Sequence, residues 1–91
     1  MNMATVIISH KVKDYAKWRP FFDADLPRRQ SAGFQNEKVF TAHDDPNNVF
    51  IIGELSDVKK FIEMKDDPGM RAIMEKAGVI SEPSAIILKK A

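Results

Sequence analysis

The chain has 91 residues, of which 44% are hydrophobic and 30% are charged, a composition typical of a folded domain with a single hydrophobic core. Its 14 basic and 13 acidic residues are interspersed and leave a formal net charge of +1, which excludes the strong electrostatic field that favours nucleic acid or an anionic membrane as a partner. Because the chain has no cysteine, disulfides, thiolate metal sites and a cysteine nucleophile are also excluded.

The first predicted element is a β-strand over residues 4–12. Side chains alternate between the two faces of a strand, so one face of this strand carries four residues that we expect to be buried together. These residues are Val6, Ile8, His10 and Val12.

A helical region follows the strand. Asp14 has the short acceptor side chain of a helix cap, and four apolar residues recur behind it at helical spacing, on one face. They are Tyr15, Trp18, Phe22 and Leu26. Pro20 should kink the helix, unless the helix begins at residues 19–20, and Pro27 should break it again before Gly33 ends the region.

Two extended runs over residues 34–42 and 48–55 predict an antiparallel hairpin. The segment between them, residues 43–47, is rich in the Asp, Pro and Asn residues that tight turns favour. The second run is apolar on both faces, which indicates a central strand that is covered on both sides.

The last third of the sequence predicts two helices in series and a final strand. Asp57 caps a first helix, whose apolar face would hold Val58, Phe61 and Ile62. Asp67 and Pro68 then start a second helix, which Gly78 ends. The run over residues 85–88 is again apolar on both faces and predicts a strand.

This order predicts an α+β fold of the ferredoxin-like βαββαβ type, a single domain over residues 1–91 with both helical regions on one face of a four-stranded antiparallel sheet. The other sheet face would expose more apolar surface than a monomer tolerates. We therefore expect a homodimer in which two sheets form a dimeric α/β barrel and bury roughly 2,000 Å² or more. A charge in place of Ile51 or Ile87 should disrupt the fold or the dimer.

Several short segments carry a resemblance to a known group. They are residues 14–18, 21–23, 32–33, 44–47, 70–71 and 77–79. With the first strand, these segments resemble the dimeric α/β-barrel superfamily and, within it, small bacterial proteins similar to the antibiotic biosynthesis monooxygenase-like domain. The superfamily includes cofactor-free monooxygenases, haem-degrading enzymes, isomerases, cyclases and ligand-sensing domains, so the resemblance implies the fold rather than one activity.

Haem degradation is disfavoured, because relatives with that activity place an Asn on the first strand and a Trp and a His in the second helical region. This chain has none of them there. We expect no cofactor. No metal site is expected either, because the residues 44–48 lack the spacing of a calcium loop and the two histidines have no partners at ligand spacing.

His10 is the candidate catalytic residue, as a general base, because imidazole titrates near neutral pH; a hydrogen-bonded core histidine is the alternative. The candidate ligand-binding residues are Tyr15, Trp18, Phe22 and Asn36. Helical spacing also explains the three aromatic residues as core. We expect the remaining polar candidates to lie on the surface. They are Arg19, the pair Arg28 and Arg29, His43 and Arg71.

Two functions stay open. In the first, the cleft between helices and sheet binds a small apolar metabolite without assured catalysis. The alternative is a cofactor-independent monooxygenase, or an isomerase or cyclase, that acts on a small aromatic or polyketide-like substrate. A cavity reached by His10 or Asn36 favours an enzyme, and a cleft filled by Trp18 and Phe22 favours a packing module. No apolar run approaches the roughly 20 residues of a membrane span, and no secretory signal is recognisable, so we expect a cytoplasmic protein.

Overall fold

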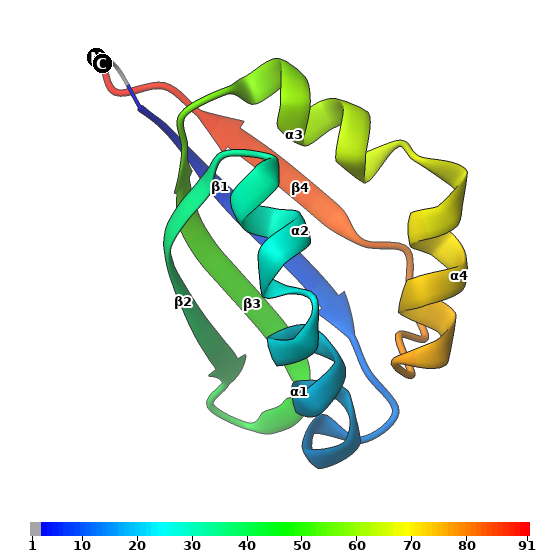
Figure 1. Cartoon of the computed structure of the whole chain (residues 1–91). Coiled ribbons are helices and arrows are strands. Elements are labelled where there is room, and N and C mark those ends of the chain that lie inside the picture. The colour runs from blue at the N-terminus through cyan, green and yellow to red at the C-terminus, as the bar shows by residue number, and fades with distance from the viewer. Residues whose placement is uncertain (1–2) are drawn as a thin grey trace.

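The computed structural model describes residues 3–91. Along the chain it contains β1 (Ala4–Lys11), α1 (Tyr15–Ala24), α2 (Leu26–Ser31), β2 (Phe34–Ala42), β3 (Asp45–Leu55), α3 (Val58–Lys65), α4 (Pro68–Lys76) and β4 (Ser84–Leu88). Figure 1 shows these elements as the predicted βαββαβ order, in which each helical region is divided into two helices. No helix of the described chain is long and apolar enough to span a membrane.

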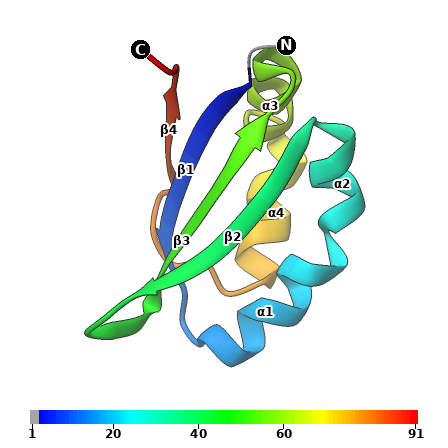
Figure 2. The same cartoon turned by 90° about the vertical axis from the view of Figure 1, so that its left-hand side faces the viewer.

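The four strands form one antiparallel sheet of order β2-β3-β1-β4. β3 lies between β2 and β1, as its apolar character on both faces indicated. All four helices cover the same face of the sheet, and the opposite face is bare (Figure 2). The predicted ferredoxin-like α+β fold is therefore confirmed.

The core lies between the sheet and the helices. Its buried side chains come from both layers, and they are Val6, Val12, Trp18, Phe34, Val49, Ile51, Leu55, Phe61 and Ala77. The alternation predicted for β1 is confirmed, because Val6, His10 and Val12 are buried and Ile8 is half-buried against this core.

The predicted helix ends are also confirmed. The side chains of Asp14, Asp57 and Asp67 each accept a hydrogen bond from a backbone N–H in the first turn of their helix, at 2.9, 3.1 and 2.8 Å. Gly33 and Gly78 end the two helical regions with φ of 82° and 87°, a conformation that favours glycine.

The two prolines of the first helical region act differently from each other. Pro20 lies inside α1, which begins at Tyr15, so the alternative of a helix start at residues 19–20 is wrong. The Asp14 cap secures the first turn ahead of the proline. Pro27 lies in the first turn of α2, where a backbone N–H would have no partner within the helix, so the proline costs no hydrogen bond there. The break between α1 and α2 therefore falls before Pro27.

The hairpin turn is shorter than the sequence predicted. β3 begins at Asp45 instead of residue 48, and only His43 and Asp44 remain between the strands. Pro46 can lie within β3 because the pairing with β2 shifts register at this end of the hairpin. Two residues predicted on apolar helix faces, Leu26 and Ile62, are 39% exposed.

The bare side of the sheet carries a row of apolar side chains that we call the open face. The register pairs Ile7 with Ile52 and Ile86, so these three central residues share one face. With their neighbours the set is Ile7, Phe40, Phe50, Ile52, Ile86 and Leu88. Ile51 and Ile87 lie on the opposite side, where they contact the core.

Candidate functional site

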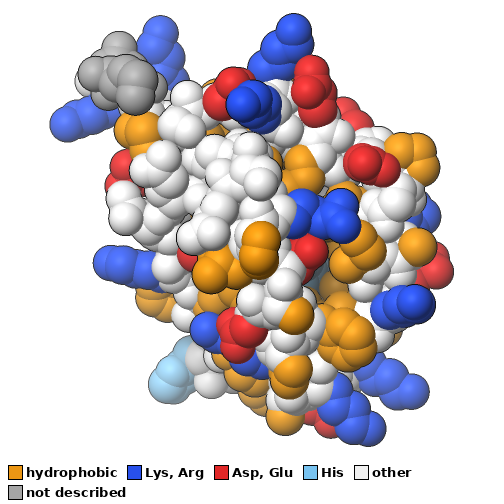
Figure 3. Space-filling view, in the orientation of Figure 1, with side chains coloured by type: hydrophobic (Ala, Val, Ile, Leu, Met, Phe, Trp, Pro, Cys, Tyr) orange, Lys and Arg blue, Asp and Glu red, His pale blue; other side chains and the backbone are white. Residues whose placement is uncertain are grey.

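A cavity of about 840 Å³ lies between the sheet and the two helical pairs. α1 and α2 cover the sheet on one side of it, and α3 and α4 lie on the other side (Figure 1). Its wall is mainly apolar, and it includes Ile8, Trp18, Phe22, Phe61, Met74 and Ala85. Figure 3 shows apolar side chains on both sides of the hollow and charged ones around it. Trp18 and Phe22 thus line the cleft without filling it.

His10 places a polar group on the cavity wall. The residue is 7% exposed, and its buried Nδ1 has no hydrogen-bond partner within residues 3–91. Burial lowers the pKa of the imidazole from its ordinary value of 6.5. At neutral pH the ring is therefore uncharged, with one nitrogen that donates and one that accepts a hydrogen bond.

An aromatic strip extends from His10 along α1. The ring of His10 meets Trp18 edge-on with centroids 5.5 Å apart, and Trp18 stacks on Phe22 at 4.9 Å with an angle of 26° between the rings. Residues 18 and 22 lie one helical turn apart, which brings the two rings side by side. The strip contributes aromatic apolar surface to the cavity wall.

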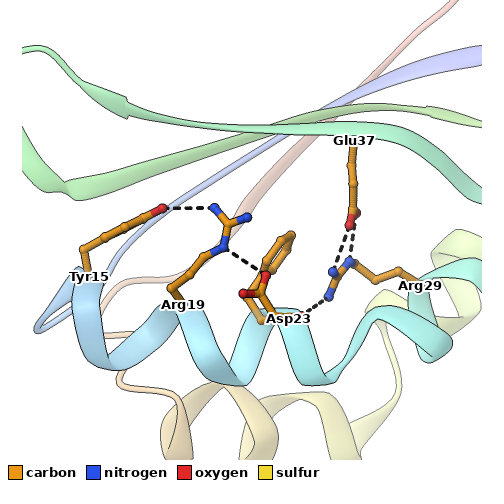
Figure 4. Close-up of polar contacts among 6 residues, drawn as sticks. Tyr15, Arg19, Asp23, Arg29 and Glu37 are labelled. Atoms are coloured by element: carbon orange, nitrogen blue, oxygen red, sulfur yellow. Dashed lines mark hydrogen bonds and ion pairs between the residues drawn. The ribbon is translucent and has the colours of Figure 1, made fainter.

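Arg29 ends this strip, and the sequence prediction that it is a solvated surface residue is wrong. Its Nε and Nη2 each donate to Glu37 at 2.8 Å, and its Nη1 donates to the backbone carbonyl of Phe22 at 2.7 Å (Figure 4). The guanidinium carbon lies 3.6 Å from the centroid of the Phe22 ring. Phe22 lies in α1 and Arg29 in α2, so helical spacing in the sequence did not signal that Arg29 shares the inward face.

Two predicted ligand-binding residues lie elsewhere. The half-buried Tyr15 accepts a hydrogen bond from Arg19 at 3.0 Å through its hydroxyl, and it does not line the cavity (Figure 4). Asn36 is exposed on β2, with φ of 53° at an irregularity of the ladder, and it does not line the cavity either. The structure therefore brings together His10, Trp18 and Phe22 but not Tyr15 and Asn36.

The other polar candidates are on the surface. His43 is exposed in the hairpin turn, as expected. Arg19 is half-buried and pairs with Asp23, and Arg71 is exposed and pairs with Glu82 at 3.1 Å. The hydrogen bond from Arg19 to the Tyr15 hydroxyl, with that to Asp23, raises the pKa of the guanidinium, so it stays charged.

Acidic side chains outnumber basic ones around the cavity. Five carboxylates line it, from Asp25, Asp66, Asp67, Glu75 and Glu82, against three basic groups, from Arg29, Lys65 and Arg71. Each of the three basic groups forms an ion pair with a carboxylate. The part of the chain that the structure describes has no group of three His, Asp or Glu side chains able to hold a metal ion.

Comparison with known proteins extends the description of the fold. No family model and no curated protein sequence matches the chain. Among solved structures, SnoaB, a cofactor-independent oxygenase from Streptomyces nogalater, superposes with a TM-score of 0.70 and 17% identity over 100% of this chain and 97% of its own.

Two further structures show the same likeness. A candidate antibiotic biosynthesis monooxygenase from Bordetella bronchiseptica has a TM-score of 0.78 and 12% identity over 100% of this chain and 99% of its own. A conserved protein from Methanosarcina mazei has a TM-score of 0.74 and 14% identity over 100% of this chain and 95% of its own. The resemblance to antibiotic biosynthesis monooxygenase-like proteins that the sequence predicted is thus confirmed at the level of the fold.

Proposed function

We propose that this chain binds a small, largely apolar metabolite in the cavity between helices and sheet. The observation that carries the proposal is the cavity of about 840 Å³, whose mainly apolar wall includes the buried polar side chain of His10. A cavity with an apolar wall and a few polar groups is typical of a site for a small ligand. The Trp18 and Phe22 rings supply the apolar contact.

A fluorescent probe tests this proposal. N-phenyl-1-naphthylamine is uncharged and apolar and brightens in an apolar site. We expect it to bind with an affinity that Ala85→Phe lowers about tenfold or more, because Ala85 lines the cavity and the larger side chain occupies it. Ile86→Phe is the matched control, since the next residue of β4 points to the open face. Equal binding by both variants would place the probe outside the cavity and contradict the proposal.

Catalysis without a cofactor is a second candidate function. Two observations favour it: the uncharged imidazole of His10 at the cavity, which can accept a proton, and the likeness of the fold to a cofactor-independent oxygenase. Oxygen uptake with 1,5-dihydroxynaphthalene tests it. Uptake that His10→Gln abolishes, while that variant still binds the naphthylamine probe, would support an enzyme, and no uptake by either protein would leave binding as the function.

We also propose that the open face is the interface of a homodimer. Phe40, Ile86 and Leu88 are 48%, 52% and 43% exposed, although they belong to one apolar surface with Ile7 and Ile52. Contiguous apolar surface of this kind marks an interaction site, and a two-fold axis would lay the same face of a second copy on it. The cytoplasmic location stays a prediction from the sequence.

A further inference from the structure

Arg29 is distinct among the charged groups of the cavity because it alone is buried. It is 7% exposed, whereas Lys65 and Arg71, the other basic residues of the lining, are exposed. A buried guanidinium is costly unless its charge is compensated and its N–H groups have acceptors. Whether each of those N–H groups has an acceptor in the chain therefore decides whether Arg29 can donate a hydrogen bond to a ligand.

The chain uses only part of the hydrogen-bonding capacity of Arg29. A guanidinium has five N–H groups in one plane. Nε and Nη2 donate to the two carboxylate oxygens of Glu37, and Nη1 donates to the Phe22 carbonyl. Nη1 and Nη2 each carry a second N–H, and neither of these has an acceptor within residues 3–91. Arg29 lines the cavity and also, with Glu37, a neighbouring hollow of about 360 Å³, so a molecule bound beside its guanidinium can supply one.

The charge of Arg29 is already compensated. Glu37 holds the guanidinium through two hydrogen bonds of 2.8 Å, and both side chains are largely buried, at 9% and 18% exposed. An anionic ligand would therefore meet a neutral pair rather than a free cation. It would also enter past carboxylates that outnumber the basic groups of the lining. Both effects disfavour a carboxylate or phosphate and leave an uncharged acceptor as the suitable group.

We propose that Arg29 determines the specificity of the cavity, and that it selects an uncharged, largely apolar molecule with a carbonyl-type acceptor. The inference rests on the proposed binding function and adds the ligand class. The apolar body of the ligand lies along Trp18 and Phe22, and its carbonyl oxygen accepts from the unused N–H groups of Arg29. His10 contacts the ligand at the other end of the aromatic strip.

Three molecules of nearly equal shape test the ligand class. Acetophenone carries a carbonyl, cumene replaces it with an apolar group, and benzoate replaces it with an anion. Their affinities are measured by displacement of N-phenyl-1-naphthylamine from the full chain. In the unmodified protein we expect acetophenone to bind about tenfold more tightly than benzoate, because the cavity offers donors without net positive charge.

Two variants then separate recognition from a structural role. Arg29→Met should lower the affinity for acetophenone relative to cumene about fivefold, the effect of one hydrogen bond. Glu37→Gln should raise the affinity for benzoate relative to acetophenone about five- to tenfold, because the charge of Arg29 is then uncompensated. If Arg29 had only a structural role, neither of these two relative affinities would change. Arg28→Met, at the exposed neighbour, is the control, and circular dichroism verifies that each variant is folded.

Each outcome has a distinct meaning. Unchanged ratios in both variants would overturn the role of Arg29 and leave the proposed binding function in place. Failure of the unmodified protein to bind the naphthylamine probe would overturn the binding function and this inference with it. If Arg29→Met does not fold, the role of Arg29 is tested by Glu37→Gln alone. An affinity for benzoate relative to acetophenone that is unchanged in Glu37→Gln then overturns the inference.

Discussion

The two faces of the sheet differ in how their apolar residues are covered. The inner face is packed against four helices and holds the core, yet it also contains the cavity and two buried polar residues, His10 and Arg29. The open face has no such cover, and its row through Ile7, Ile52 and Ile86 is apolar. The difference separates the two proposed roles, which are ligand binding at the inner face and association at the open face.

The largest expected effect is at the inner face. Ile51→Asp places a carboxylate where the side chain is 4% exposed and surrounded by core residues. We expect a loss of about 4 kcal/mol or more in the free energy of unfolding, enough to unfold a domain of this size. Urea unfolding followed by circular dichroism measures it. A folded Ile51→Asp protein of normal stability would show that the inner face is not the core.

Loss of the buried ion pair should have the second largest effect. Arg29→Met leaves Glu37 without its partner, and we expect the free energy of unfolding to fall by about 2–3 kcal/mol, less than for a fully buried pair because Glu37 is 18% exposed. Arg28→Met is the matched control, since Arg28 and Asp25 are 42% and 24% exposed and such pairs contribute about 0–1 kcal/mol. Equal losses in the two variants would contradict the structural difference between these neighbours.

The open face should respond in assembly rather than in folding. Ile52→Asp changes the residue next to Ile51, but on the other side of the sheet and at the centre of the proposed interface. We expect a folded monomer where the unmodified chain is a dimer, because an unpaired carboxylate in an apolar interface is costly. Light scattering after size exclusion gives the mass. A dimer that persists in Ile52→Asp would exclude the open face as its interface.

The smallest expected effect is a pH dependence from His10. Burial lowers the pKa of this histidine in the folded chain below its ordinary 6.5, so below that pH the unfolded chain binds the extra proton first. The contribution of the buried, uncharged His10 to the free energy of unfolding is therefore complete above pH 6.5. It is lost as the pH falls from 6.5 towards the lower pKa that His10 has in the folded chain. We expect the free energy of unfolding to decrease less between about pH 7.5 and pH 5.5 in His10→Gln than in the unmodified chain.

His43 provides the control for that measurement. It is exposed in the hairpin turn, so His43→Gln should keep the full pH dependence. A loss of the pH dependence in His43→Gln, or its persistence in His10→Gln, would show that another group is responsible.

The fold was accessible from the sequence because each element carries a local signal. Asp14, Asp57 and Asp67 were recognisable as caps, and the alternation from Val6 to Val12 set the inner face of β1. The start of β3 was misplaced because Pro46 and its neighbours read as a loop. In the structure that segment pairs irregularly with β2. This pairing is determined by contacts between the strands and has no signal in the local sequence.

The candidate site was only partly accessible. His10, Trp18 and Phe22 followed from strand alternation and helical spacing. Arg29 was missed because a basic pair ordinarily lies in water, and its partner Glu37 comes from β2, across a turn whose geometry the sequence does not specify. Asn36 was favoured for its side-chain chemistry, but a local irregularity of β2 leaves it exposed and away from the cavity.

The most direct test of the binding function is to locate a bound molecule by NMR. N-phenyl-1-naphthylamine is titrated into the full chain, and intermolecular NOEs are recorded to Trp18 and Met74 in the cavity and to Phe40 and Ile86 on the open face. We expect NOEs to Trp18, the single tryptophan, and to Met74. NOEs confined to Phe40 and Ile86, or no NOE at a saturating concentration of the probe, would contradict a binding site between the helices and the sheet.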